Sequence, residues 1–178
     1  MNLDALKSKM LSGEELKTAI PDSTLYIHSQ LKNFTNIRQL FRGTVPNVCF
    51  ILYEWGQDNG AISGHWCLVI EHLNDILMFD PYGASLTEQW NYVKGHFKTE
   101  PYLINLLNKS GMKVYNNTEQ YQGKGYEINT CGRWCILRAM YESLNEEQFY
   151  NRVVELCHEM RLSPDNMVTK LTYDLFGF

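Results

Sequence analysis

Runs of apolar residues give the middle of the chain strand character. The segments NVCFILYE at 47–54, HWCLVIE at 65–71 and ILMFD at 76–80 are dense in β-branched, aromatic and other apolar residues, and they predict three strands. The last two are joined by HLND, a favourable hairpin turn. MKVYN at 112–116 predicts a further strand.

Helical signals lie on both sides of these strands. Ser12 and Glu15 form a capping-box pattern for a short helix, and Thr35 favours the start of a second helix through Phe41, both before the first strand. Residues 121–130 predict a loop. The other predicted helices are 86–97, 102–108, 131–143, one capped by Asn145 and Gln148 that ends at Met160, and one that starts at Ser163-Pro164-Asp165. The pattern predicts an α+β fold with a central sheet and helices at both ends.

Composition and charge narrow the class of protein. The 178 residues are 44% hydrophobic and 13% aromatic, without repeats or linkers, which predicts a single domain over 1–178. A formal charge of -4 and a pI near 5.7 argue against a nucleic-acid partner. No apolar run has the length of a membrane span, and the N-terminal residues carry charges where a signal peptide needs apolar ones. We expect an intracellular protein.

The cysteines offer three chemistries. Cys131 and Cys135 stand four apart at a predicted helix start, where a zinc pair, a disulfide or a catalytic nucleophile are all open. A structural zinc site needs a second close pair of ligands, and the adjacent Cys157 and His158 share a metal poorly. A disulfide within one helical turn would strain the required geometry. An odd total of five cysteines argues against a disulfide scaffold.

The third chemistry fits Cys131. A thiolate at a helix N-terminus is stabilised by backbone N–H groups and by the helix dipole. Gly132 beside it would let a substrate backbone approach the sulfur. Cys135 falls one turn further along the same face, where a small buried side chain is expected.

A nucleophilic thiol needs a base and a group that orients the base. His65 follows Gly64 and opens a predicted strand, so its ring can project from the sheet edge. The other four histidines lie in or beside helix or turn contexts typical of surface or half-buried positions. In a hairpin centred on Leu73 and Asn74, the two far strand ends are neighbours. The pattern therefore predicts that His65 and Asp80 lie close together.

These residues stand in an order that is typical of a known group of enzymes. GHW at 64–66, FDPYG at 79–83, a glutamine in a Gly-rich loop and NTCGRWC at 129–135 resemble the adenovirus-protease and Ulp1-like cysteine peptidases. The runs ILYEWGQDNGAISGHWCLVI and LSPDNMVTKLTYDLF resemble the compact proteases of large DNA viruses, virophages and Maverick-type elements. The resemblance covers about residues 25–176.

The resemblance implies a fold and a triad. The fold would be that of the papain-like cysteine peptidase superfamily, of the adenain/Ulp1-like type, with a mixed sheet packed against a helix that carries the nucleophile. Cys131, His65 and Asp80 would be the triad.

It also implies supporting residues. Gln122 would help to form the oxyanion hole, with Gln120 as the alternative because the loop before Cys131 is longer than in the family. Trp66 matches a family aromatic that covers the catalytic ring, and it would border the substrate cleft with Gly132. A core tryptophan is the alternative interpretation of Trp66.

The expected activity is that of a cysteine endopeptidase. By the resemblance it would be a viral maturation protease that cleaves capsid or other virion precursors, in the virion and the host-cell cytoplasm. The alternative is an isopeptidase that removes ubiquitin- or SUMO-like proteins. A non-catalytic binding module and an acetyltransferase with the same triad are further hypotheses. No metal or cofactor is expected, and the acidic balance argues against stimulation by DNA.

Overall fold

A five-stranded mixed sheet forms the centre of the computed structural model, which describes residues 2–41, 47–58, 61–95 and 98–178. The strands are Thr24–Ile27 (β1), Asn47–Asp58 (β2), Ala61–His72 (β3), Asp75–Phe79 (β4) and Lys113–Asn116 (β5). They lie in chain order across the sheet. The two edge pairs, β1 with β2 and β4 with β5, are parallel, and the inner pairs are antiparallel.

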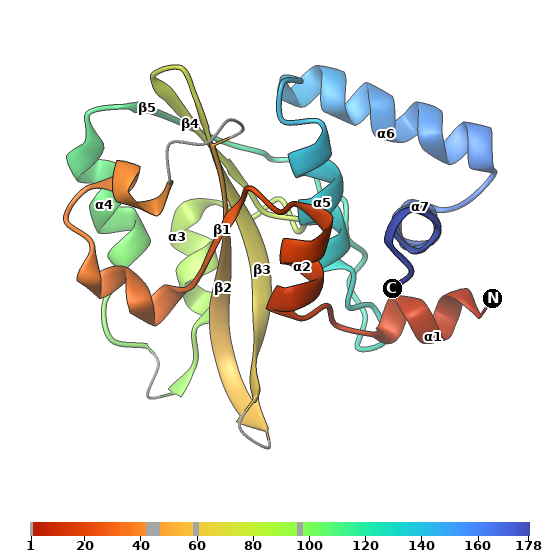
Figure 1. Ribbon diagram of the computed structural model, residues 1–178, viewed down its shortest axis with the longest axis horizontal. Coiled ribbons are helices and arrows are strands. Elements are labelled where there is room, and N and C mark those ends of the chain that lie inside the picture. Colours follow the sequence, from red (N-terminus) through yellow and green to blue (C-terminus); the bar gives the residue numbers. More distant parts are fainter. Residues whose placement is uncertain (1, 42–46, 59–60, 96–97) are drawn as a thin grey trace.

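The helices cover both faces of the sheet, as Figure 1 shows. The α helices are Leu3–Ser8 (α1), Gly13–Ala19 (α2), Leu86–Gln89 (α3), Tyr102–Ser110 (α4), Cys131–Met140 (α5), Glu146–Met160 (α6) and Pro164–Phe176 (α7). Helix α5 packs against β3 with α2, α6 and α7 on the same side, and α3 and α4 lie on the other side. Three short 3₁₀ helices within the described ranges are His28–Asn33, Ile37–Leu40 and Trp90–Tyr92.

Alternation along β3 divides the buried residues into two layers. Trp66, Leu68 and Ile70 pack with the α5 side, and Cys67 and Val69 pack with the α4 side. Both faces of the strand are therefore buried, which explains its continuous apolar run in the sequence. Within the described part of the chain, no helix combines the length and the apolar character that crossing a bilayer requires.

Several local predictions are confirmed. The hairpin turn joins β3 to β4 with His72 opposite Asp75, and Leu73 at its tip has φ 59°. Ser12 with Glu15, and Asn145 with Gln148, form the predicted capping boxes. The α+β prediction with a mixed central sheet is also confirmed.

Other local predictions are wrong in detail. Strand β1 was not predicted, and it separates the two early helices that were expected to precede all strands. The second of these is a 3₁₀ helix that Asn36, not Thr35, caps. The predicted helix 86–97 is shorter, since α3 and a 3₁₀ turn end by Tyr92, and residues 96–97 lie outside the described residues.

Candidate active site

His65 and Asp80 form a buried hydrogen-bonded pair. His65 Nε2 lies 2.8 Å from Asp80 Oδ1, and the two side chains are 1% and 0% exposed. His65 does not open its strand as predicted but lies inside β3, opposite Tyr53 of β2. On its other side, β3 pairs with β4, which ends at Phe79. Asp80 is the next residue along the chain, and its carboxylate therefore reaches the His65 imidazole.

The carboxylate of Asp80 is fixed by further donors. Oδ1 also accepts from the backbone N–H of Tyr82 at 2.9 Å, and Oδ2 accepts from the Tyr92 hydroxyl at 3.0 Å. Asn117 holds the Asp80 backbone, because its side chain accepts from the N–H and donates to the carbonyl, each at 2.7 Å. No short-range pattern in the sequence indicated Tyr92 or Asn117.

The imidazole of His65 is enclosed by aromatic rings. Tyr82 stacks on it at 4.7 Å with 14° between the planes, and Tyr92 meets it edge-on at 4.8 Å. Burial alone lowers the pKa of His65, but the hydrogen bond with Asp80, the neighbouring Cys131 and the charges of both residues raise it to about 9. Nδ1 has no partner at hydrogen-bonding geometry among the described residues. Since Nε2 serves Asp80, Nδ1 is the ring atom left for the Cys131 thiol.

Cys131 is the first residue of α5 and is 3% exposed. The preceding Thr130 does not cap the helix, because its hydroxyl donates to Asp165 Oδ1. Asp165 also accepts from the Trp134 indole and from the Gly123 N–H, which ties the loop before Cys131 to α7. The first N–H groups of α5 therefore keep no side-chain partner and can stabilise negative charge beside the sulfur.

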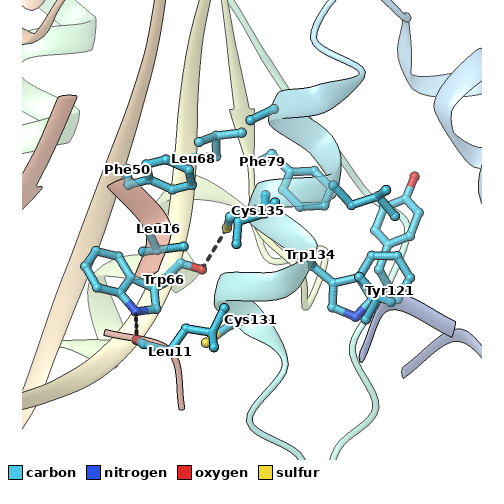
Figure 2. Close-up of a cluster of buried hydrophobic side chains, with 14 of the residues drawn as sticks. Leu11, Leu16, Phe50, Trp66, Leu68, Phe79, Tyr121, Cys131, Trp134 and Cys135 are labelled. Atoms are coloured by element: carbon cyan, nitrogen blue, oxygen red, sulfur yellow. Dashed lines mark hydrogen bonds between the residues drawn. The ribbon is translucent and has the colours of Figure 1, made fainter. Parts of the chain in front are cut away.

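Cys135 lies one turn further along α5, and its side chain packs in the hydrophobic core. It is fully buried, and its Sγ is 3.4 Å from the carbonyl oxygen of Trp66, as Figure 2 shows. Burial, and then the charge of Cys131, raise its pKa. All five cysteines are free thiols, so Cys131 and Cys135 form no disulfide.

The loop before α5 brings Gln122 to the site and leaves Gln120 outside. Gln122 is 2% exposed, and its Nε2 donates to the Tyr82 hydroxyl at 3.2 Å and to the Ile128 carbonyl at 2.9 Å. The Gln120 side chain is on an exposed residue and donates to the backbone carbonyl of Gln122. The amide nearer to the reacting groups is therefore that of Gln122.

Trp66 and Gly132 lie beneath the N-terminal segment. The Trp66 indole donates to the Leu11 carbonyl at 3.0 Å (Figure 2). A Cβ on Gly132 would lie 3.2 Å from Leu11 Cβ. Trp66 is 3% exposed and Gly132 is buried. Their predicted place in a substrate cleft finds no support in this packing, which gives both residues a core role instead.

Surface hollows lie beside Tyr82. One of about 460 Å³ is lined by Tyr82, Tyr92 and Glu88, among others, and one of about 640 Å³ includes Trp55, Tyr126 and Ile128. Tyr82 and Lys124 border both hollows, so both lie beside the ring that stacks on His65. A further hollow of about 500 Å³, between β4 and the start of α6, does not include them.

Three side chains within the described residues have the ligand types that could hold a metal ion. The ligand atoms of His65, Cys67 and Asp80 all lie within 4.8 Å of one another. His65 and Asp80 already bond to each other, and burial raises the pKa of Cys67, which disfavours the thiolate that a metal needs. The group fits proton transfer better than metal binding.

Two solved structures show weak likeness. The central domain of the uncharacterized Lpg1148 protein from Legionella pneumophila has a TM-score of 0.49 at 17% identity, over 95% of this chain and 97% of that chain. The SUMO protease Ulp1 with its catalytic cysteine oxidized to a sulfinic acid has a TM-score of 0.34 at 12% identity, over 96% of this chain and 76% of that chain. Neither score is high enough to carry an argument.

One known protein is similar to this chain in sequence over most of its length. No protein-family model matches the chain. Uncharacterized protein V9 of the Sputnik virophage is 32% identical to it over 130 residues, which are 70% of this chain and 72% of protein V9. The chain therefore belongs to the same protein family as protein V9 of the Sputnik virophage.

Proposed function

We propose that the chain is a cysteine peptidase of papain-like architecture that uses Cys131 as nucleophile, His65 as base and Asp80 as the group that orients the base. One observation carries the proposal. His65 is bonded through Nε2 to a fully buried Asp80 at 2.8 Å, its Nδ1 has no hydrogen-bond partner among the described residues, and the Cys131 thiol stands at the start of α5. A thiol, an imidazole and a carboxylate in this relation match the nucleophile, base and orienting group of triad hydrolases.

The raised pKa of His65 suits it to the role of base. A group whose pKa is about 9 can take and hold a proton at neutral pH, so we propose that His65 receives the proton of the Cys131 thiol when the sulfur attacks. The sulfur attacks the carbonyl carbon, and the π electron pair moves to the oxygen. When the C–N bond breaks, His65 gives its proton to the leaving amine, and it later takes one from the water that frees the acyl-enzyme.

Donors for the oxyanion come from two elements. The uncapped start of α5 supplies the Cys131 N–H, and the loop before it supplies the Gln122 amide. Fixed donors that face a developing negative charge typically contribute more to rate than to substrate binding. Asp165 supports both, because it holds Thr130 and Gly123 on either side of this loop.

The proposed substrates are capsid or other virion precursor proteins, cut in the virion or in the host-cell cytoplasm. A relative encoded by a virophage supports a role in the viral life cycle. The hollows on both sides of Tyr82 are open at the surface and suit an extended peptide. We propose neither a nucleic-acid nor a membrane partner, in keeping with the acidic balance of the chain.

The test is incubation of the purified chain with a virophage capsid precursor, with products identified by intact mass spectrometry. Ubiquitin and SUMO with C-terminal thiol-reactive groups, incubated in parallel, report deconjugase activity. Discrete cleavage by the wild type and none by Cys131→Ala would support the proposal. Labelling of Cys131 by the ubiquitin-like probes without precursor cleavage would replace the maturation role by deconjugation. Absence of both would refute peptidase chemistry.

A further inference from the structure

Tyr82 touches several parts of the proposed catalytic group. Its ring stacks on His65 at 4.7 Å, and its backbone N–H donates to Asp80 Oδ1 at 2.9 Å. Its hydroxyl accepts a hydrogen bond from Gln122 Nε2 at 3.2 Å. The Tyr82 hydroxyl has no role in the peptidase steps proposed for Cys131, His65, Asp80 and Gln122.

The Gln122 amide shows where an oxyanion would be received. Its two N–H bonds point to the Ile128 carbonyl at 2.9 Å and to the Tyr82 hydroxyl. The Ile128 carbonyl also fixes the orientation of the amide, because the opposite orientation would set two oxygens against each other. Ile128 belongs to the backbone just before α5, so the acceptor that an incoming oxygen can join or replace is the Tyr82 hydroxyl.

The hydroxyl of Tyr82 can itself donate. Among the described residues no acceptor takes its proton, and a hydroxyl that accepts one hydrogen bond can still give another. Burial, followed by the charges of Cys131 and Asp80, raises the pKa of Tyr82 to about 12. The O–H group therefore stays protonated in the pH range in which a thiol peptidase works.

We infer that the Tyr82 hydroxyl donates a hydrogen bond to the oxyanion of the tetrahedral intermediate, beside the Gln122 amide and the Cys131 backbone N–H. The inference rests on the proposed peptidase function. When the sulfur bonds to the carbonyl carbon, the π pair becomes the negative charge on the oxygen. The hydroxyl then turns its proton from solvent to this oxygen, and no proton is transferred.

The backbone around Tyr82 makes such a donor rigid. Gly83 donates to the Asp80 carbonyl at 2.8 Å and has φ +69°, which closes a tight turn around Tyr82. The Pro81 carbonyl accepts from the Gln122 backbone N–H at 2.9 Å. Tyr82 and Gln122 are therefore fixed relative to each other before substrate binds, as electrostatic stabilisation of a transition state requires.

The experiment compares Tyr82→Phe with wild type. The variant keeps the ring on His65 and the N–H on Asp80, and it loses only the hydroxyl. We expect kcat on a peptide substrate to fall by roughly 100-fold with little change in KM, since the donor acts on the developing charge. Binding of a peptide aldehyde, which forms a tetrahedral adduct with Cys131, should weaken in parallel. Alkylation of Cys131 by iodoacetamide, which forms no oxyanion, should keep its rate.

A double variant separates donation from mere support of Gln122. If Tyr82 only positions the amide, adding Tyr82→Phe to Gln122→Ala will cost nothing further; if it donates, a second large loss in kcat is expected. Tyr173→Phe, on a tyrosine of α7 that is 38% exposed, is the matched control and should behave as wild type. Wild-type kcat in Tyr82→Phe, or no further loss in the double variant, would overturn the inference. Failure of the wild type to cleave peptide or bind aldehyde would instead refute the proposed function.

Discussion

Replacement of Asp80 by asparagine should separate the charge of this residue from its geometry. Oδ1 accepts from His65 and from the Tyr82 N–H, whereas Oδ2 accepts from the Tyr92 hydroxyl. A hydroxyl can turn and accept, but an N–H cannot. The asparagine amide should therefore settle with its nitrogen toward Tyr92, so that the hydrogen bond to His65 survives and the negative charge is lost.

The magnitude follows from the pKa of His65. Although burial lowers that pKa, the hydrogen bond with Asp80, the neighbouring Cys131 and the charges of both residues raise it from an ordinary 6.5 to about 9. Loss of the carboxylate charge removes its direct attraction and also weakens the charge-assisted hydrogen bond, so it should lower the pKa of His65 by roughly one unit, or about 10-fold in the protonation equilibrium. The alkaline limb of kcat/KM, where the enzyme loses imidazolium, should move down by the same amount.

The same shift predicts the pH dependence of stability. Because the folded state raises the pKa of His65, the stability that protonated His65 contributes is complete below pH 6.5 and is lost as pH rises through about 9. The wild type should therefore lose stability across this window, and Asp80→Asn should lose less. Histidine titration by NMR, with thermal denaturation at pH 6 to 9.5, measures both effects.

Asp75→Asn is the matched control. Asp75 begins β4 at the hairpin end away from the site, opposite His72. Its replacement should leave the His65 titration and the pH profile as in wild type. Equal His65 midpoints in the Asp80 and Asp75 variants would refute the assignment of Asp80 as the charge that holds the imidazolium.

Five further substitutions test other parts of the site. Cys131→Ala should abolish turnover, while Cys135→Ala should retain measurable turnover because its thiol is buried and its pKa is raised; the opposite result in folded variants would move the nucleophile. Gln122→Ala should lower the acylation rate by roughly 100-fold at unchanged thermal stability, and Gln120→Ala should be silent; a defect in Gln120→Ala alone would transfer the oxyanion role. Leu11→Ala removes a side chain that is 2% exposed beside Gly132, so it should cost about 2–5 kcal/mol of stability and speed alkylation of Cys131. Calorimetry and iodoacetamide kinetics measure these effects, and an unchanged alkylation rate would show that Leu11 does not shield the thiol.

The central strands could be predicted because both faces of β2 and β3 are buried and their apolar runs are dense. The start of β3 was misplaced because Ser63 and Gly64 interrupt that density. Gly64 belongs inside the strand, since a Cβ there would lie 2.2 Å from the Tyr53 carbonyl oxygen. Strand β1 escaped prediction because four residues at a sheet edge carry too little pattern, and its parallel pairing with β2 depends on tertiary contact.

Some contacts of the candidate site could likewise be predicted from the sequence, and others could not. The contact of His65 with Asp80 could be predicted from the hairpin, which brings the far strand ends together, whereas Cys131 was added to them by the resemblance. The partners of Asp80 could not be predicted, because Asn117 acts from 37 positions away and Tyr92 ends a short 3₁₀ helix after α3. Such contacts are set by how loops cross each other in the fold, and the local sequence carries no periodic signal for them.

Asp165 shows how a distant residue can prepare a nucleophile. A threonine before a helix usually adopts an extended backbone and caps the first N–H groups, but Thr130 has φ -92° and ψ 4° and donates its hydroxyl to Asp165. If Thr130 capped α5, its hydroxyl oxygen would accept a hydrogen bond from a first-turn N–H group, and that N–H group could then no longer stabilise a thiolate. The carboxylate of Asp165, itself in the first turn of α7, takes the hydroxyl away and holds Trp134 and Gly123 as well. The sequence at the start of α7 indicates only a helix cap. In the structure this segment also leaves the first N–H groups of α5 without a side-chain cap, so that they can stabilise negative charge on the Cys131 sulfur.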